Sequence, residues 1–195
     1  MKRILILLSL LLPLLPAQAQ RKSFRPGEIW PDDKGVHINA HGGGILLHRG
    51  TYYWFGEHKT EGRGGNQAHV GVHCYSSKDL YNWKDEGIVL KVSDDPESMI
   101  TDGCILERPK VIYNPKTRKF VMWFHLEPKG KGYSGAMVGI AQASKVTGPF
   151  TFIRATRATP QMWPVDVKPF HKIPREGEKS GRTGRISRPA SIRIQ

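Results

Sequence analysis

Hydrophobic and polar residues alternate along the middle of the chain, and this pattern predicts short β-strands. Between positions 69 and 75 every second residue is apolar, the period of two that is typical of a half-buried strand. Residues 37–57 predict two more strands joined by a turn at Gly50, and residues 79–90 predict a turn and a fourth strand. Helical periodicity is nowhere convincing. The sequence therefore predicts an all-β protein.

The same succession of motifs occurs twice along the chain. Trp54 and Trp123 stand 69 positions apart, and Gly71 and Gly139 stand 68 positions apart. A fixed period indicates that one supersecondary unit is used repeatedly, and four short strands per unit are the content of one β-propeller blade. Two blades cannot close a ring. We therefore expect a β-propeller of which this chain holds about two blades, as the opening portion of a larger molecule.

The first 19 residues have the pattern of a secretory signal peptide. Lys2 and Arg3 precede an apolar run over residues 4–15, and Ala17 and Ala19 form a small-x-small cleavage site. The alternative is an uncleaved membrane anchor, but the run is shorter than the ~20 residues that a spanning helix needs. We expect residues 1–19 to be removed, no membrane span in the mature chain, and a secreted or periplasmic protein.

Charge and composition divide the remainder into a propeller region, 20–170, and a basic tail, 171–195. The formal net charge is +13, and the tail holds seven Lys and Arg against two Glu. Residues 175–188 are rich in Gly, Arg, Ser and Lys without periodicity, so they bury too little apolar surface to offset their ordering entropy. We expect a mobile, solvated tail, or one weakly attracted to acidic polysaccharide, and no nucleic-acid partner.

The chain has two cysteines, Cys74 and Cys104. A disulfide is permitted after export, but Cys74 belongs to an apolar strand of the first repeat and Cys104 begins the second. Two separate buried thiols are the expected arrangement.

Polar residues at the start of predicted inner strands are the candidates for chemistry. In a propeller the innermost strand of each blade lines the central channel, and its first residues open onto one face. His41 and Glu107 hold this position in their repeats, 66 residues apart, so we expect them to converge there. An imidazole beside a carboxylate suits acid–base chemistry, and the glycines at 42–44 allow a ligand to approach the backbone closely.

Histidine spacing also suggests a metal site as an alternative. His37 and His41 share a strand face, as do His69 and His73. No cysteine or carboxylate accompanies either pair at a diagnostic spacing, so neither a metal site nor a cofactor is predicted.

Structural roles are the alternatives for the remaining candidates. Trp54 and Trp123 occupy matching repeat positions, which favours a role in the core. Glu107 has an ion pair with Arg108 as its alternative. Glu57 is open between a ligand contact and a hydrogen bond at the edge of the blade.

Four separated motifs together resemble glycoside hydrolase family 43, and more narrowly its exo-β-1,3-galactanase branch. The motifs are His37-x-x-x-His41-Gly-Gly-Gly, Tyr52-Tyr53-Trp54-Phe55-Gly56-Glu57, Tyr75-Ser76-Ser77-Lys78-Asp79-Leu80-x-x-Trp83 and Glu107-Arg108-Pro109-Lys110-Val111-Ile112-Tyr113-Asn114. The resemblance covers roughly residues 36–172. It implies a five-bladed propeller that hydrolyses glycosidic bonds of a polysaccharide or oligosaccharide with inversion.

The resemblance also implies roles for individual residues. Glu107 matches the family's third carboxylate, which orients and tunes the general acid, and the acid itself falls on a later blade, beyond Gln195. Most of the family has an aspartate base on the first inner strand, where this chain has His41. Substrate contacts are expected from His37, His41, Glu57 and Tyr113. The missing aspartate keeps a non-catalytic carbohydrate-binding propeller as the alternative function.

The repeat pattern has a consequence for stability. An open pair of blades leaves an apolar sheet face without a neighbour, and burial of one large apolar side chain is worth about 1.5–3 kcal/mol. We therefore expect the isolated chain to aggregate or to fold only in part. On the second unit the exposed face is expected to draw on Val111, Ile112, Val121, Trp123, Val138 and Ile140.

Overall fold

A computed structural model describes residues 20–62, 64–67 and 69–157 of the 195-residue chain. Their regular structure is β throughout, apart from two short 3-10 turns at Gly65–Gln67 and Tyr133–Gly135, so the predicted all-β class is confirmed. No helix among these residues has the length and apolar character needed to cross a membrane. The signal-peptide prediction for 1–19 and the tail prediction for 171–195 fall outside the described residues.

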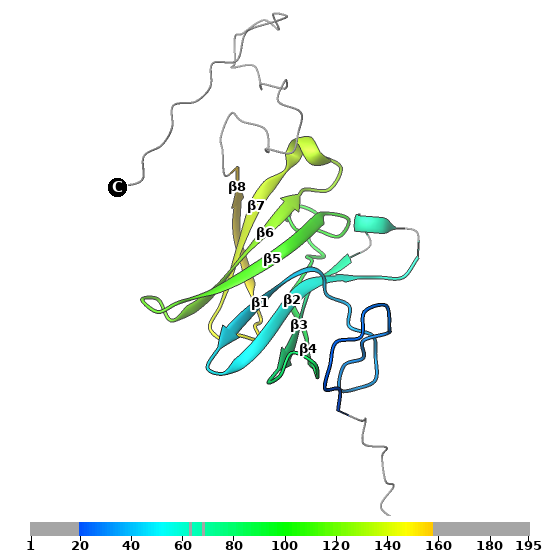
Figure 1. Ribbon diagram of the computed structural model, residues 1–195. Coiled ribbons are helices and arrows are strands. Elements are labelled where there is room, and N and C mark those ends of the chain that lie inside the picture. Colours follow the sequence, from blue (N-terminus) through cyan, green and yellow to red (C-terminus); the bar gives the residue numbers. More distant parts are fainter. Residues whose placement is uncertain (1–19, 63, 68, 158–195) are drawn as a thin grey trace, which may run out of the picture. The chain divides into compact units, whose positions relative to one another are not determined.

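The first repeat forms a four-stranded antiparallel sheet in the order β1-β2-β3-β4 (Figure 1). Its strands are His41–His48, Thr51–Lys59, His69–Ser77 and Lys84–Lys91. The alternation seen over 69–75 thus belongs to β3. Each strand pairs with its neighbour in the sequence, as expected for a propeller blade.

The second repeat forms an equivalent sheet in the order β5-β6-β7-β8. Its strands are Ile105–Asn114, Lys119–Glu127, Met137–Ala143 and Thr151–Thr156. The sequence period therefore corresponds to one whole sheet, and the prediction of about two blades is confirmed.

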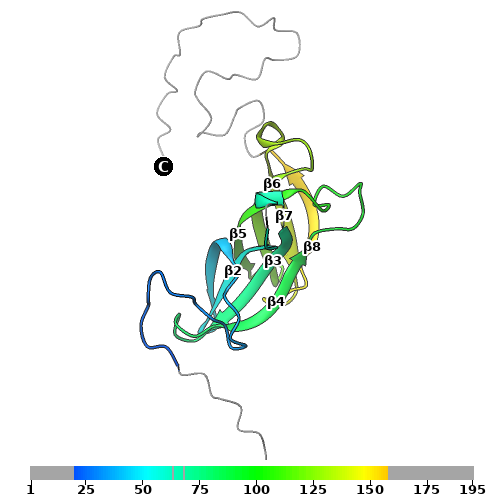
Figure 2. The ribbon, with the colours of Figure 1, turned by 90° about the vertical axis from the view of Figure 1, so that its right-hand side faces the viewer.

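The two sheets share one hydrophobic core, to which both contribute side chains. Figure 2 shows the ribbon of both sheets from the side. Phe55, Val72 and Cys74 contribute to the core from the first sheet, and Leu106 and Met122 contribute from the second; all five are almost completely buried. Successive side chains of a strand point to opposite faces, so Val72 and Cys74, two positions apart on β3, both reach this core. This packing fixes the inner strands β1 and β5 against each other.

The N-terminal segment, residues 20–40, covers the other face of the first sheet. Its Trp30 and Ile38 pack with Trp54, Tyr75 and Trp83 of that sheet in a second apolar cluster. Trp30 also donates its indole N–H to the carbonyl oxygen of residue 81 at 2.9 Å. The predicted core role of Trp54 is therefore confirmed.

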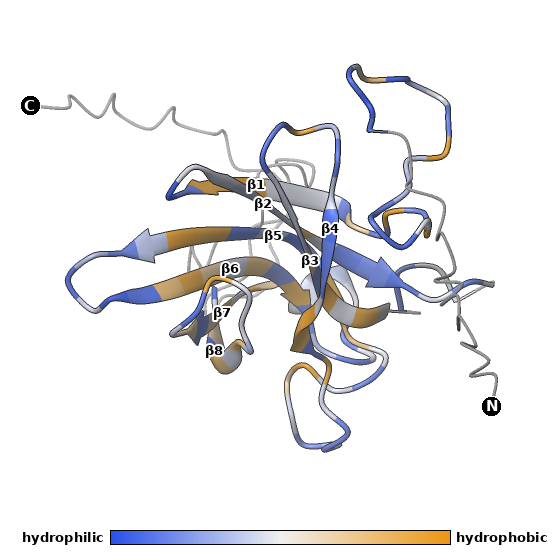
Figure 3. Cartoon of the chain, turned by 90° about the horizontal axis from the view of Figure 1, so that it is seen from below, coloured by the Kyte–Doolittle hydropathy of each residue, from blue (hydrophilic) through white to orange (hydrophobic). Residues whose placement is uncertain are grey.

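The corresponding face of the second sheet is open, and two sequence predictions change there. Trp123 is 44% exposed, with Ile112 and Ile153 also exposed, so the predicted core role of Trp123 is wrong. Trp54 and Trp123 are equivalent in the two repeats but have different neighbours. Among the described residues, the N-terminal segment covers this face of the first sheet, and no segment covers it on the second sheet. Val111, expected on the open face, points into the core instead. Figure 3 shows hydrophobic residues along β5 and β6.

Cys74 and Cys104 are both buried, and neither forms a disulfide bond. The expectation of two separate buried thiols is confirmed. Burial raises the pKa of Cys104 to about 11 and raises that of Cys74 as well, so both remain protonated thiols at neutral pH.

Candidate functional site

The beginnings of the two inner strands lie side by side. A Cβ atom placed on Gly42 of β1 would lie 3.6 Å from the backbone nitrogen of Arg108 of β5. The Lys110 ammonium donates to the carbonyl oxygen of Gly43 at 2.9 Å. The predicted convergence of these two segments is therefore observed at the level of the backbone.

Both inner strands are interrupted at the same repeat position. The pairing of β1 with β2 shifts directly after His41, and the pairing of β5 with β6 shifts directly after Glu107. The next residue is left-handed in each case, with φ 57° at Gly42 and φ 54° at Arg108. Bulges of this kind re-aim a side chain and are frequent beside active sites. The two bulges therefore influence the orientation of the His41 and Glu107 side chains, the candidates predicted from the sequence.

Glu57 of β2 connects the two bulges. It is completely buried, and its Oε1 accepts the backbone N–H of Arg108 at 3.0 Å. Its Oε2 lies 3.1 Å from the Lys59 ammonium and 3.3 Å from His41 Nδ1. A buried carboxylate needs such partners. Of the two roles left open for Glu57, the structure has the hydrogen bond; the ligand contact stays a prediction.

His41 and Glu107 differ from Glu57 in being accessible. The His41 side chain is 70% exposed although its Nδ1 contacts the Glu57 carboxylate. Glu107 is half-buried, and its carboxylate makes no hydrogen bond or ion pair with any described residue. The alternative of an ion pair with Arg108 is therefore not observed, and the role of Glu107 toward a general acid stays a prediction.

The two remaining site candidates lie elsewhere. Tyr113 is six residues beyond Glu107 on β5, about 20 Å along an extended strand, with its ring packed near His48 and Phe120 at centroid distances of 5.0 and 4.9 Å. This placement speaks against a site shared with Glu107. His37 is exposed on the N-terminal segment, and its Nδ1 accepts the backbone N–H of Trp30 at 3.2 Å.

Sequence reasoning missed a chain of polar groups on the outward face of the first sheet. Nδ1 of His58 lies 2.9 Å from Nδ1 of His73, whose Nε2 lies 2.5 Å from Asp85 Oδ1. Lys34 reaches the other oxygen of Asp85 at 2.6 Å. Burial and then the neighbouring His73 charge lower the pKa of His58. Burial opposes ionisation of Asp85, but hydrogen bonds from His73 and Lys34 hold its pKa at about 2.

No local sequence signal reveals these linked polar groups. His58, His73 and Asp85 lie on three different strands, and the pairing of β3 with β4 is shifted by irregularities in the register. The sequence pattern groups His73 only with His69, as a possible metal pair. Across the described part of the protein, no group of three or more His, Cys, Asp or Glu side chains is arranged to hold a metal ion.

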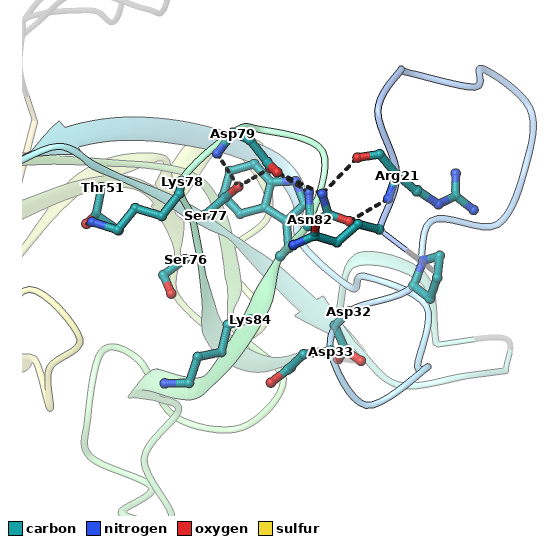
Figure 4. A pocket seen from close by; sticks show the side chains of 13 residues that line it. Arg21, Asp32, Asp33, Thr51, Ser76, Ser77, Lys78, Asp79, Asn82 and Lys84 are labelled. Carbon is teal, nitrogen blue, oxygen red and sulfur yellow. Dashed lines mark hydrogen bonds between the residues drawn. The ribbon is translucent and has the colours of Figure 1, made fainter. Parts of the chain in front are cut away.

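A hollow of about 600 Å³ lies at the edge of the first sheet, against the N-terminal segment (Figure 4). Several of its polar groups form hydrogen bonds with one another. Lys78 donates to the Thr51 hydroxyl at 2.6 Å, and Asp79 accepts the backbone N–H of Asn82 at 2.8 Å. The Asn82 amide donates to the Arg21 carbonyl at 2.9 Å. These bonds shape the β3–β4 turn, and no predicted site residue lines the hollow.

Comparison with known proteins gives matches among solved structures. No protein-family model and no curated protein matches the chain. A family 43 β-1,3-galactosidase, solved with galactodeoxynojirimycin, is 53% identical over 73% of this chain, with a TM-score of 0.64. An exo-β-1,3-galactanase from Phanerochaete chrysosporium, solved with β-1,3-galactotriose, is 38% identical over 67% of this chain, with a TM-score of 0.60.

An exo-β-1,3-galactanase from Clostridium thermocellum is 41% identical over 67% of this chain, with a TM-score of 0.59. The chain spans less than half of each of these three structures: 41% of the galactosidase, and 29% and 27% of the two galactanases. Both the all-β class and the sequence resemblance therefore agree with these matches.

Proposed function

Because this chain belongs to glycoside hydrolase family 43, we propose that it supplies two blades of an exported propeller that hydrolyses β-linked galactosyl bonds of plant-type polysaccharide. The observation that carries the proposal is the meeting of His41, Glu57 and the Glu107 bulge at the start of adjacent inner strands. It occurs in a chain 53% identical to a β-1,3-galactosidase.

The proposed reaction proceeds with inversion and uses residues from several blades. An inverting glycosidase needs a general acid and a general base about 6.5–9.5 Å apart across the sugar. Glu107 orients and tunes the acid, which another blade supplies, and its carboxylate has no described partner to compete for that role. His41 presents an exposed imidazole to a sugar hydroxyl, held by contact with Glu57.

Hydrolysis by these 195 residues alone is expected to be very slow. General acid catalysis contributes about 10²–10⁴-fold to the rate, and a sugar pocket built by two blades lacks further contacts. Incubation with β-1,3-galactan, with β-1,4-galactan and xylan as controls, measures this directly. Turnover equal to that of a complete family 43 galactanase contradicts the proposed division of labour.

The role of Glu107 in catalysis is tested in the complete protein, which carries all the blades. Glu107→Gln removes the charge without changing the shape, and it should lower kcat on β-1,3-galactan by at most the contribution of general acid catalysis, about 10²–10⁴-fold. Glu97→Gln, at an exposed position outside the site, is the matched control and should leave kcat unchanged. If the complete protein binds galactan without cleaving it, the non-catalytic carbohydrate-binding propeller is the better assignment.

A further inference from the structure

The peptide bond that follows Glu107 is held by a residue of the other sheet. Its N–H, on Arg108, donates to the carboxylate of Glu57 at 3.0 Å. The β5 strand leaves its register with β6 at this point, so this N–H does not take part in the regular ladder. The direction in which Glu107 leaves the backbone therefore depends on a side chain of β2.

Arg108 has a conformation that its own residue type does not favour. Its φ of 54° lies in the left-handed region, which L-residues other than glycine adopt only when the surroundings over-determine it. At the equivalent position of the first sheet the residue is Gly42, which needs no such support. The second bulge thus has a conformational cost that the first does not, and a hydrogen bond to a buried carboxylate offsets it.

The surroundings of Glu57 fix where its acceptor oxygens lie. A Cβ atom on Gly42 would stand 2.5 Å from Oε1, so only glycine leaves room for the carboxylate between the strands. The Lys59 ammonium, 3.1 Å from Oε2, provides the opposite charge that a buried carboxylate needs. The position of the carboxylate is therefore fixed by contacts other than its hydrogen bond with the Arg108 N–H.

We propose that Glu57 is a positioning residue, which holds the left-handed bulge at Arg108 and thereby sets the orientation of Glu107. This inference rests on the proposed function, because it concerns the carboxylate assigned to catalysis. It differs from a substrate contact by Glu57, since here the carboxylate acts through the β5 backbone. Glu57 is completely buried, whereas Glu107 has no described partner that could orient it instead.

Amide hydrogen exchange, followed by NMR on the complete protein that carries all the blades, tests the proposal. In the wild-type protein the Arg108 amide should exchange slowly although it lies in a bulge. Glu57→Met keeps an unbranched side chain and removes both carboxylate oxygens, so it should accelerate exchange at Arg108 at least tenfold and shift the Glu107 amide resonance. Glu86→Met replaces a half-buried Glu of β4 that accepts the Ser76 hydroxyl within the first sheet, and should change neither signal.

Galactose titration of the same samples separates the possible outcomes. Glu57→Met should weaken galactose binding at least fivefold together with the Arg108 change. Weaker binding with unchanged Arg108 exchange would mean a direct substrate contact and would overturn the positioning role. Rapid Arg108 exchange in the wild-type protein overturns it as well, and this measurement decides the matter even if Glu57→Met does not fold. Absence of galactose binding by the wild-type protein counts against the proposed function alone.

Discussion

Gly139 and Gly71 hold equivalent positions in the two sheets, and replacing each by alanine should have unequal effects. A Cβ atom on Gly139 would collide with three ring atoms of Phe124, a buried side chain. A Cβ atom on Gly71 would collide with the carbonyl oxygen of Leu90, and Gly71 also has a φ of 143°. A ring can turn aside, whereas a carbonyl in a strand ladder cannot.

The magnitudes follow from these contacts. Overpacking costs about 1–3 kcal/mol, which is the expected loss for Gly139→Ala. Gly71→Ala adds backbone strain of about 1–3 kcal/mol, so its loss should reach about 2–6 kcal/mol. Against a domain stability of about 5–15 kcal/mol, the second variant is close to unfolding. Gly130→Ala, with a φ of 71° and no atom within 4 Å, measures backbone strain without a clash.

Urea unfolding monitored by tryptophan fluorescence gives the free energy of unfolding for each variant. Phe124→Leu removes the part of the ring that the added methyl group would strike, so the double variant Gly139→Ala/Phe124→Leu should be at least about 1 kcal/mol more stable than the sum of the single losses implies. Phe124→Leu should not rescue Gly71→Ala. Additive losses at Gly139 and Phe124, or a smaller loss at Gly71 than at Gly139, would refute this account of the packing.

Three further outcomes are expected. The pKa of Asp85 falls from 3.8 to about 2 on folding. The ionised carboxylate therefore contributes about 2 kcal/mol to the free energy of unfolding above about pH 4, and this contribution is lost as the pH falls toward 2. Asp85→Asn should make the melting temperature depend less on pH in this acidic range, and an unchanged profile contradicts the assignment. Arg108→Gly relieves a left-handed residue and should change the free energy of unfolding by less than about 1 kcal/mol, whereas a large loss in urea titration would show that the arginine side chain matters. Ile112→Lys with Trp123→Lys on the open face of the second sheet should reduce self-association without lowering the melting temperature, as measured by analytical ultracentrifugation and calorimetry; persistent association points to another surface.

The sequence was sufficient for the elements of the fold because their signals are visible in the order of the residues, without knowledge of tertiary contacts. Alternation defined β3, and the period near 68 residues defined both sheets. The exposure of Trp123 was not predictable, because burial depends on what lies across the sheet, which differs between two similar repeats. The bond from Glu57 to Arg108 was not predictable either, since it requires a left-handed arginine and the juxtaposition of residues 51 positions apart.

The bond between Glu57 and Arg108 also limits how such blades can be exchanged during evolution or in protein engineering. A blade is an attractive unit for recombination, because its strands pair only with one another. Here, however, the Glu57 carboxylate of the first blade accepts a hydrogen bond from the backbone of the second blade. A chimera that replaces the first blade must bring a suitable carboxylate with it, or it must also replace the β5 bulge. The residues at the junction between the two blades therefore need to come from the same parent protein, and crossover points are best placed away from this junction.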